Sequence, residues 1–309
     1  MKRHFYKIVL SLLLFTALHT QAQINTPDYV PANGLVGWWP FTGNAVDSSG
    51  NNNNGTVTDA VLTTDRFGNA GKAYSFNGVT SMIDVQDAAS LRCRTLTISA
   101  WVKYRNTSVT NQVVYKGSMQ ANGEAYALTI DVGGKPFSAS KYNSNCVSGT
   151  GWLGPGTGAV IDTGIWVHLV TTFDGITSKL YKNGALESSM PTPGLIDSCI
   201  GGGVRFGYDH RRYAASTGDP FNGSIDDIGI WNRALTDAEI LHLYNASLTT
   251  YGNVGINTDN PQRSLHIKDV LRLEPRSVAP SSPAKGDIYF DDTINKLRVF
   301  DGTVWQNCW

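Results

Sequence analysis

Short segments in which apolar and polar residues alternate are the strongest regular pattern along the chain. In residues 96–102 the apolar side chains occupy every second position, and this spacing places them on one face of a β-strand. Residues 166–173 form a second strong strand pattern. An Asp-Gly pair at 174–175 and an Asn-Gly pair at 183–184 predict turns after it, so this region is expected to form an antiparallel meander. The pattern does not alternate strands with long helices, which argues against a parallel α/β fold.

Two other parts of the chain also predict strands. Residues 34–41 read as an early strand that Pro40 stops, because proline cannot donate a hydrogen bond to a neighbouring strand. Residues 73–76 and 82–85 flank an Asn-Gly pair at 77–78. This arrangement predicts that the two segments form a hairpin.

A single short helix is predicted after the last strand pattern. Thr236 is a suitable N-cap and Glu239 follows three residues later, which together make a capping box. Leu235 and Ile240 occupy the two positions of a hydrophobic staple. We expect this helix to end near Asn245.

Two adjacent carboxylates, Asp226 and Asp227, lie on the strand before this helix. Because neighbours in a strand point to opposite faces, we expect only one of them to reach a given ligand. This geometry argues against catalysis, since sandwich glycosidases need two carboxylates on one face. His168 lies in a strand pattern typical of a packed histidine, and we find no nucleophile elbow or metalloprotease helix motif. The sequence therefore predicts a protein that is not an enzyme.

An ordered set of motifs resembles the laminin-G-like, concanavalin A-type sandwich domains of secreted bacterial proteins. The resemblance covers about residues 34–245, and it implies an all-β fold: an antiparallel two-sheet jelly-roll sandwich with one short C-terminal helix. We expect this domain to occupy residues 33–246. The motifs are the tryptophan strand with the Asn/Gly loop after it, and residues 74–78, 97–102, 166–170, 180–184 and 226–244.

The remaining residues, 247–309, have a different character. They resemble the stalk modules of tail-fibre-like and adhesin-like bacterial surface proteins, which associate as trimers. Residues 286–291 and 296–302 predict a hairpin that is followed by Trp305. About sixty residues with a few short strands bury too little apolar surface to be stable alone. We therefore expect a small β-rich module that forms a homo-oligomer, such as a trimer, or docks on the sandwich.

The N-terminus predicts export. Lys2, Arg3 and Lys7 precede the apolar residues 8–18, and a plausible cleavage site follows Ala22, so residues 1–22 read as a signal peptide. The apolar run is too short for a membrane span, and the chain holds no other candidate. The 25 basic and 25 acidic residues balance, which disfavours nucleic-acid binding. We expect a secreted or surface-exposed protein.

Four cysteines remain in the exported chain, and four can pair in three ways. None lies in a Cys-x-x-Cys spacing, which weakens zinc and thiol-redox hypotheses. An oxidising compartment favours at least one disulfide. We prefer Cys146 with Cys199, because both lie in Gly/Ser/Asn-rich loops, while Cys308 is expected to be free or to link two chains.

Calcium is the cofactor that the resemblance implies. Asp47 and Asn53 lie in an Asn/Gly-rich loop and carry the oxygen ligands that calcium prefers. The resemblance places the last strand beside the first, which would bring Asp226 to the same structural calcium. The alternative is that Asp47 and the asparagines shape turns while Asp226 accepts hydrogen bonds from backbone amides.

The function that we favour is non-catalytic recognition of an extracellular glycan or polysaccharide. Sugar sites combine aromatic side chains with polar hydrogen-bonding groups. The alternative for the loop at 208–213 is a solvated turn with packed tyrosines, and the alternative function is a structural or adhesive subunit of a trimeric surface fibre without a small ligand. A polysaccharide hydrolase would need two carboxylates about 5–10 Å apart in one groove. The candidate ligand-binding residues are Tyr142, Trp152, Tyr208, His210, Arg211, Arg212 and Tyr213.

Overall fold

The computed structural model divides the chain into two compact units, Met1–Leu248 and Thr249–Trp309. No helix among the described residues is long and apolar enough to cross a membrane. The residues that the structure describes are 26–105, 108–117, 124–140, 154–156, 159–197, 201–209, 218–246, 254–256, 265–267, 273 and 275–308.

Several sequence predictions concern residues outside these ranges. They are the signal peptide, the disulfide between Cys146 and Cys199, and all the candidate ligand-binding residues except Tyr208. Of the cysteines that the structure does describe, Cys93 is buried, Cys308 is exposed, and neither forms a disulfide.

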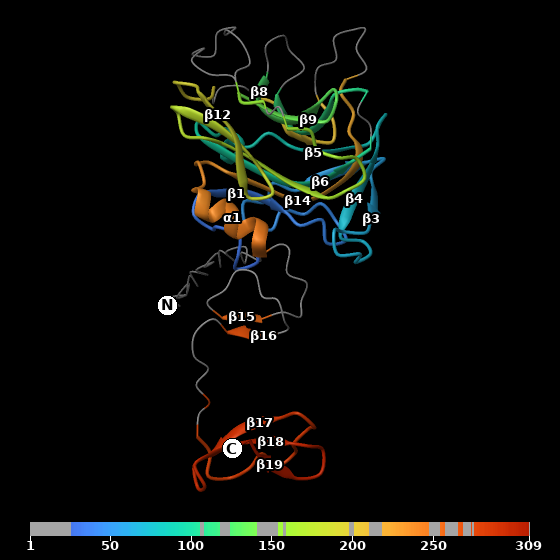
Figure 1. The fold of residues 1–309 in the computed structure, drawn as a ribbon. Helices are drawn as coiled ribbons and strands as arrows, with labels where there is room; N and C mark the ends of the chain where they lie inside the picture. The colour runs from blue at the N-terminus through green and yellow to red at the C-terminus, as the bar shows by residue number, and fades with distance from the viewer. Residues whose placement is uncertain are drawn as a thin grey trace, which may run out of the picture. The chain divides into compact units, whose positions relative to one another are not determined.

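The first unit is a sandwich of two antiparallel sheets (Figure 1). Among the described residues, sheet A has eight strands in the order β12-β11-β10-β6-β14-β4-β3, with β1 also paired to β14. Sheet B has the order β2-β5-β13-β7-β8-β9. Sheet A consists of β1 (Leu35–Trp39), β3 (Val61–Thr63), β4 (Ala73–Asn77), β6 (Leu96–Tyr104), β10 (Val167–Phe173), β11 (Thr177–Lys182), β12 (Ala185–Pro191) and β14 (Asn222–Trp231). Sheet B consists of β2 (Gly55–Thr58), β5 (Met82–Val85), β7 (Asn111–Gly117), β8 (Glu124–Asp131), β9 (Lys135–Ser140) and β13 (Val204–Phe206).

This architecture confirms the predicted all-β jelly-roll sandwich. The consecutive strands β10, β11 and β12 form the expected meander, since each is antiparallel to the next. The last sandwich strand, β14, also lies beside the first, β1, as the resemblance implied. A short 3-10 helix, η1 (Ala89–Leu91), precedes β6.

Two neighbouring tryptophans on β1 show how alternation builds the two sides of sheet A. Trp39 is fully buried between the sheets, where its ring meets the edge of Phe206 at a centroid distance of 4.8 Å. Trp38 points to the opposite face, as successive strand residues must. There it packs with Trp231 in a second apolar cluster, which lies under helix α1 (Asp237–Ala246).

The helix begins as its sequence predicts. The Thr236 amide donates to Glu239 Oε2 at 2.8 Å, and the Glu239 amide donates to Thr236 Oγ1 at 3.2 Å, which completes the capping box. Leu235 and Ile240 are both buried in the second apolar cluster. Figure 1 shows the helix on the side of sheet A that faces away from sheet B.

The predicted hairpin between β4 and β5 is wrong. The two strands are not paired: β4 lies in sheet A beside β14 and β3, while β5 lies in sheet B beside β2 and β13. The turn between them is closed by Asn77, whose Oδ1 accepts hydrogen bonds from the amides of Val79 and Thr80 at 2.8 and 2.9 Å. The Asn-Gly pair therefore marks a turn that carries the chain from one sheet to the other.

The second unit contains two small sheets among its described residues. β15 (Val254–Ile256) pairs in parallel with β16 (Leu265–Ile267). β17 (Ile288–Asp291), β18 (Lys296–Phe300) and β19 (Trp305–Asn307) form an antiparallel sheet, in which β17 and β18 are the predicted hairpin. The rings of Tyr289 and Trp305 meet edge to face at 4.7 Å.

Candidate functional site

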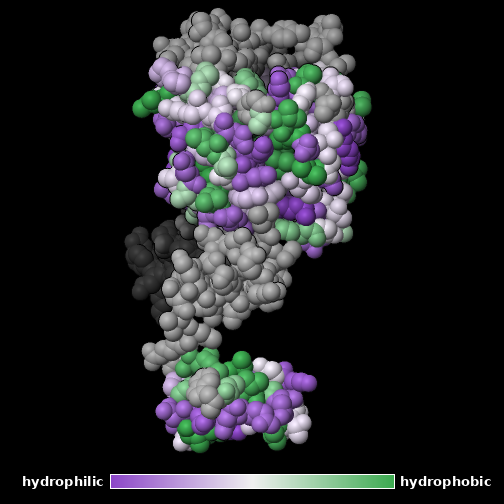
Figure 2. Space-filling view, in the orientation of Figure 1, coloured by the Kyte–Doolittle hydropathy of each residue, from purple (hydrophilic) through white to green (hydrophobic). Residues whose placement is uncertain are grey.

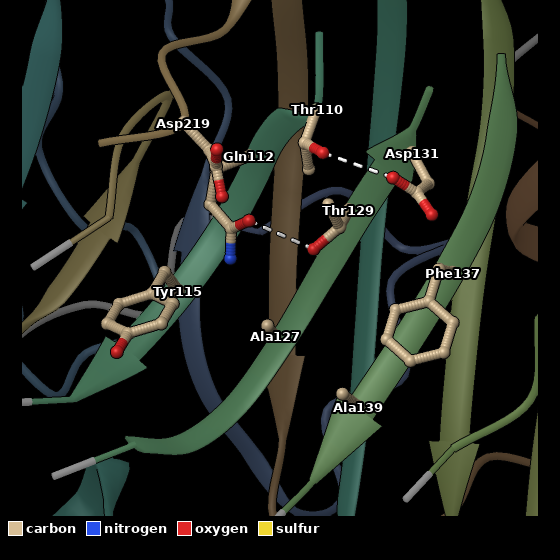
Figure 3. A pocket seen from close by; sticks show the side chains of 9 residues that line it. All are labelled: Thr110, Gln112, Tyr115, Ala127, Thr129, Asp131, Phe137, Ala139 and Asp219. Carbon is tan, nitrogen blue, oxygen red and sulfur yellow. Dashed lines mark hydrogen bonds between the residues drawn. The ribbon is translucent and has the colours of Figure 1, made fainter. Parts of the chain in front are cut away.

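A pocket of about 220 Å³ lies on the outer face of sheet B, the face turned away from the sandwich core (Figure 3). Three neighbouring strands, β7, β8 and β9, supply most of its lining. The lining residues are Thr110, Gln112, Tyr115, Ala127, Thr129, Asp131, Phe137, Ala139 and Asp219.

The strand register explains the shape of this pocket. Tyr115, Ala127 and Ala139 are partners across the three strands, so they form one row on the outer face. Gln112, Thr129 and Phe137 form the next row by the same pairing. The two alanines leave open space because their side chains are short, and Figure 3 shows the rings of Tyr115 and Phe137 on either side of Ala127. The result is a hollow with an aromatic ring on each side.

Hydrogen bonds hold the polar side chains of the pocket in fixed positions. Thr129 Oγ1 donates to Gln112 Oε1 at 3.0 Å. Thr110 Oγ1 and the Val132 amide both donate to Asp131 Oδ1, at 3.1 and 2.8 Å. Gln112 therefore presents its side-chain N–H groups to an incoming molecule, and Asp131 presents its second oxygen as an acceptor.

Exposure distinguishes the bottom of the pocket from its mouth. Tyr115 and Gln112 are only 0% and 2% exposed, and Ala127 and Ala139 are each 3% exposed, so these side chains line the buried part of the pocket. Phe137 and Asp219 are half-buried and Asp131 is exposed, so these side chains stand where a ligand enters.

The turn between β8 and β9 places Asp131 at the mouth. Gly133 and Gly134 have φ values of 80° and 75°, a conformation that favours glycine, and they follow directly after Val132. A side chain at Gly134 would also collide with Tyr104 Oη, which would lie 2.1 Å from its Cβ. These two glycines allow the chain to reverse direction directly after β8. The outer face of β9 therefore lies beside the outer face of β8.

Sequence reasoning did not identify this pocket. The region from residue 121 to 158 gave weak strand patterns, and no motif marked its polar residues. The signal that was present is the Gly-Gly pair at 133–134, which predicts a hairpin and with it the pairing of β8 with β9.

Tyr208 is the predicted ligand-binding residue that the structure describes. It is 7% exposed, its ring lies 5.9 Å from the guanidinium of Arg205, and it packs against Gly218. Tyr208 is therefore a packed side chain. Gly218, against which Tyr208 packs, directly precedes Asp219 at the mouth of the pocket.

Asp47, a predicted calcium ligand, is surrounded by hydrogen-bond donors of the protein. Its Oδ1 accepts from the amides of Trp38 and Ser49 at 3.0 and 2.8 Å. Its Oδ2 accepts from Ser49 Oγ and from the Asn53 amide, both at 2.9 Å. The side-chain amide of Asn53 in turn donates to the Val36 carbonyl at 2.7 Å. These contacts tie the Asn/Gly loop to β1.

The third predicted ligand, Asp226, is held by an arginine. Arg66 Nη1 lies 2.7 Å from Asp226 Oδ2, and Nη2 lies 2.8 Å from Asp227 Oδ2. Among the described residues, no three His, Cys, Asp or Glu side chains gather as metal ligands. Calcium binding stays a prediction.

The expectation that Asp226 and Asp227 point to opposite faces is wrong. The register of β14 against β6 shifts between Asp226 and Gly229, and Asp227 has a φ of 45°. This bulge re-aims the second side chain, so that both carboxylates meet Arg66. Burial and the neighbouring carboxylate raise the pKa of Asp226, and burial raises the pKa of Asp227.

An aromatic stack lies beside this cluster. The Arg66 guanidinium sits 4.8 Å from the Trp101 ring, and Trp101 stacks on His168 at 5.1 Å. His168 also stacks on Tyr244 of α1 at 6.0 Å, and its Nε2 lies 2.8 Å from Ser99 Oγ. Burial lowers the pKa of His168 to about 3. The predicted role of His168 as a packed histidine is confirmed.

Together, the two antiparallel sheets and helix α1 define a jelly-roll sandwich. A sequence model described as the concanavalin A-like lectin/glucanases superfamily matches residues 76–241. The chain belongs to this superfamily. No curated protein matches the chain.

Solved structures share the fold. Domain 4 of a GH43 extracellular arabinanase from Geobacillus stearothermophilus, in complex with arabinotriose, is 23% identical, with a TM-score of 0.54 over 68% of this chain and 98% of that one. The binding domain of Paraclostridial Mosquitocidal Protein 1 is 20% identical, with a TM-score of 0.55 over 71% and 54%. The binding domain of botulinum neurotoxin DC, in complex with SialylT, is 15% identical, with a TM-score of 0.52 over 72% and 53%. The chain thus spans about half of each toxin structure.

Proposed function

We propose that the protein is a secreted or surface-exposed carbohydrate-binding protein that holds a glycan in the pocket on the outer face of sheet B. The observation that carries the proposal is the pair of rings, Tyr115 and Phe137, on either side of a floor made by alanines. Sugar rings have apolar faces that pack on aromatic side chains and hydroxyl groups that need hydrogen-bond partners. The pocket offers both kinds of partner within one hollow.

Two other findings support a glycan as the ligand. The superfamily match is to lectins and glucanases. The arabinanase domain and one toxin domain with the same fold were solved in complex with arabinotriose and with SialylT. The predicted signal peptide supports a location outside the cell, where such polymers occur.

The first experiment is a glycan and polysaccharide array with the purified exported chain, with calcium and again with EDTA. We expect binding to a defined class of sugar. The variant Phe137→Ala, which removes the half-buried ring, should weaken that binding at least about tenfold, which is about 1.4 kcal/mol. The matched control is Ile176→Ala, because Ile176 is 70% exposed in the turn between β10 and β11 of the other sheet. Silence across the array from a folded protein, or equal binding by Phe137→Ala, would contradict the proposal.

A second candidate function comes from Asp131 and Asp219, two carboxylates at the mouth of the same pocket. Glycoside hydrolases use a pair of carboxyl groups about 5–10 Å apart. Binding without catalysis predicts no release of reducing sugar from any polysaccharide that the protein binds. Sustained release that is abolished by Asp131→Asn would replace the binding proposal with a hydrolase.

A further inference from the structure

We propose that the Arg66 guanidinium is the permanent cation of the sandwich, and that the residues from which the resemblance predicted a calcium site do not hold this ion. Those residues are Asp47, Asn53 and Asp226. Two sets of contacts support this assignment: those that occupy the predicted ligands, and those that surround the guanidinium. Neither set involves the pocket on sheet B, so the proposal is independent of glycan binding.

The oxygens of Asp47 are already used by the protein itself. A carboxylate offers about four lone-pair positions to hydrogen-bond donors. Asp47 accepts four hydrogen bonds of 2.8–3.0 Å, two on each oxygen, and three of the donors are backbone amides of β1 and of the loop after it. A calcium ion at Asp47 would have to displace these donors, which would leave buried amides without partners.

Asn53 is engaged in a similar way. Its side-chain nitrogen donates to the Val36 carbonyl at 2.7 Å, and Ser90 Oγ lies 3.1 Å from the nitrogen and 3.4 Å from the oxygen of the same amide. Its backbone carbonyl accepts from Trp39 Nε1 at 2.8 Å. Asn53 therefore connects β1 to η1, and ligation of an ion would break these contacts.

The Arg66 guanidinium lies beside Asp226, the third predicted ligand. Its two terminal nitrogens bind Asp226 Oδ2 and Asp227 Oδ2 at 2.7 and 2.8 Å. The other oxygen of Asp226 accepts from the Asp227 amide at 2.9 Å. The side chains of Arg66 and Asp226 are only 6% and 3% exposed, so their contact is shielded from dissolved ions. The positive charge that these carboxylates require is thus part of the chain.

Aromatic rings make this position suitable for a planar organic cation. The centre of the Arg66 guanidinium lies 4.6 Å from the Phe67 ring and 4.8 Å from the Trp101 ring. Ring faces attract guanidinium groups, whereas calcium takes about six to eight oxygen ligands. A calcium ion in place of the guanidinium would meet two rings that cannot ligate it.

The first test is a pair of thermal melts of the unchanged exported chain, with added calcium and with EDTA. We expect no shift between them. A fall on chelation that disappears in Asp47→Asn or in Asp226→Asn would overturn the proposal, because it would place the ion at the predicted ligands. A fall that both variants retain would place an ion elsewhere in the chain and would agree with the proposal.

The second test is chemical rescue. Arg66→Ala should lower the melting temperature by several degrees, and free ethylguanidinium, at concentrations that do not denature the unchanged protein, should restore part of this loss. Calcium at equal ionic strength should not. The matched control is Arg92→Ala, which removes a partly exposed pair with Asp87 and should show no rescue.

Two results of the rescue experiment would overturn the proposal. One is rescue of Arg66→Ala by calcium in place of ethylguanidinium, which would show that the position suits a metal ion. The other is an equal response of Arg66→Ala and Arg92→Ala to ethylguanidinium, which would show that the effect does not arise at the buried position. If Arg66→Ala does not fold, the melts of the unchanged protein and of the two Asp→Asn variants still decide the question.

Discussion

Arg66 and Asp226 form a buried salt bridge of 2.7 Å between residues that lie 160 positions apart in the chain. The same guanidinium also binds Asp227, so one cation serves two carboxylates beneath the surface of sheet A. The bridge fastens the loop after β3 to the bulge of β14.

Replacement of Arg66 by methionine should lower the free energy of unfolding by about 3–5 kcal/mol, because it leaves buried carboxylates without their partner. Urea denaturation at neutral pH measures this loss. The triple variant Arg66→Met, Asp226→Asn, Asp227→Asn should recover much of it. The control is Arg92→Gln, which removes a partly exposed pair with Asp87 and should lower the free energy of unfolding much less. Equal losses for the two arginine variants would contradict a special role for the buried cluster.

His168 should make the fold sensitive to acid. Its pKa is lowered to about 3 by burial, below the ordinary value of 6.5, so the unfolded chain binds a proton at this residue more readily than the folded one. This contribution to stability is present above pH 6.5 and is lost as the pH falls toward 3. Between pH 6.5 and 4.5 it amounts to about 2–3 kcal/mol at 1.36 kcal/mol per pH unit.

The variant His168→Phe keeps a ring beside Trp101 and Tyr244 and removes the titrating group. Its free energy of unfolding should fall less steeply than that of the unchanged protein over this pH range. Ile176→Ala, at an exposed position that carries no titrating group, should keep the original slope. Parallel curves for the unchanged protein and His168→Phe would refute the argument.

Glu239 should stabilise the start of α1 at neutral pH. Hydrogen bonds from Arg233, and those of the capping box with Thr236, lower the pKa of Glu239 to about 2. Because this value lies below that of the unfolded chain, the stabilisation is complete above about pH 4.5 and is lost as the pH falls toward 2. Glu239 is partly exposed, so we expect Glu239→Gln to cost only about 1–2 kcal/mol at pH 7, as for other helix caps. The difference between the two proteins, followed by thermal melts, should shrink from pH 4.5 to pH 3.

Asp47 should be important for the first strand whether or not an ion is bound. Asp47→Ala removes the acceptor for four hydrogen bonds and leaves buried amides without partners, at about 1–3 kcal/mol for each unsatisfied group. We expect a melting temperature lower by several degrees. The same melts with calcium and with EDTA test the predicted structural ion. A fall on chelation would establish the ion, and identical curves would assign Asp47 to hydrogen bonding alone.

The C-terminal unit should mediate self-association. Its described surface exposes Val278, Ile288, Ile294 and Val304, each at least 45% accessible, and Figure 2 shows apolar side chains on its visible face. Light scattering of the full exported chain should report a homo-oligomer, such as a trimer. Removal of residues 249–309 should yield a monomer. A monomeric full-length protein would contradict this prediction.

The elements that the sequence predicts well depend on local physical rules. The capping box at Thr236 and Glu239 needs only neighbours three residues apart, and the meander after Trp166 needs only alternation and short turns. The alternating placement of Trp38 and Trp39 follows from the geometry of any strand.

The features that escape prediction depend on distant pairings. The partners of β4 and β5 come from strands elsewhere in the chain, so their Asn-Gly turn alone does not reveal that they belong to different sheets. The bulge at Asp227 appears only once β14 is aligned with β6. The pocket requires the register of three strands, since Tyr115 and Phe137 become its two sides only when Ala127 and Ala139 lie between them.

The position of β14 has a consequence for the order in which the sandwich can assemble. It is the last sandwich strand in the sequence, yet it lies inside sheet A, between β6 and β4, and it also pairs with β1. Until residues 222–231 are available, β1, β4 and β6 lack the strand that connects them to one another, and neither apolar cluster is complete. Contacts over such long sequence separations slow folding. We therefore expect the growing chain to remain an open precursor until Trp231, the last residue of β14, has been made, and a fragment that ends earlier to be sensitive to proteolysis.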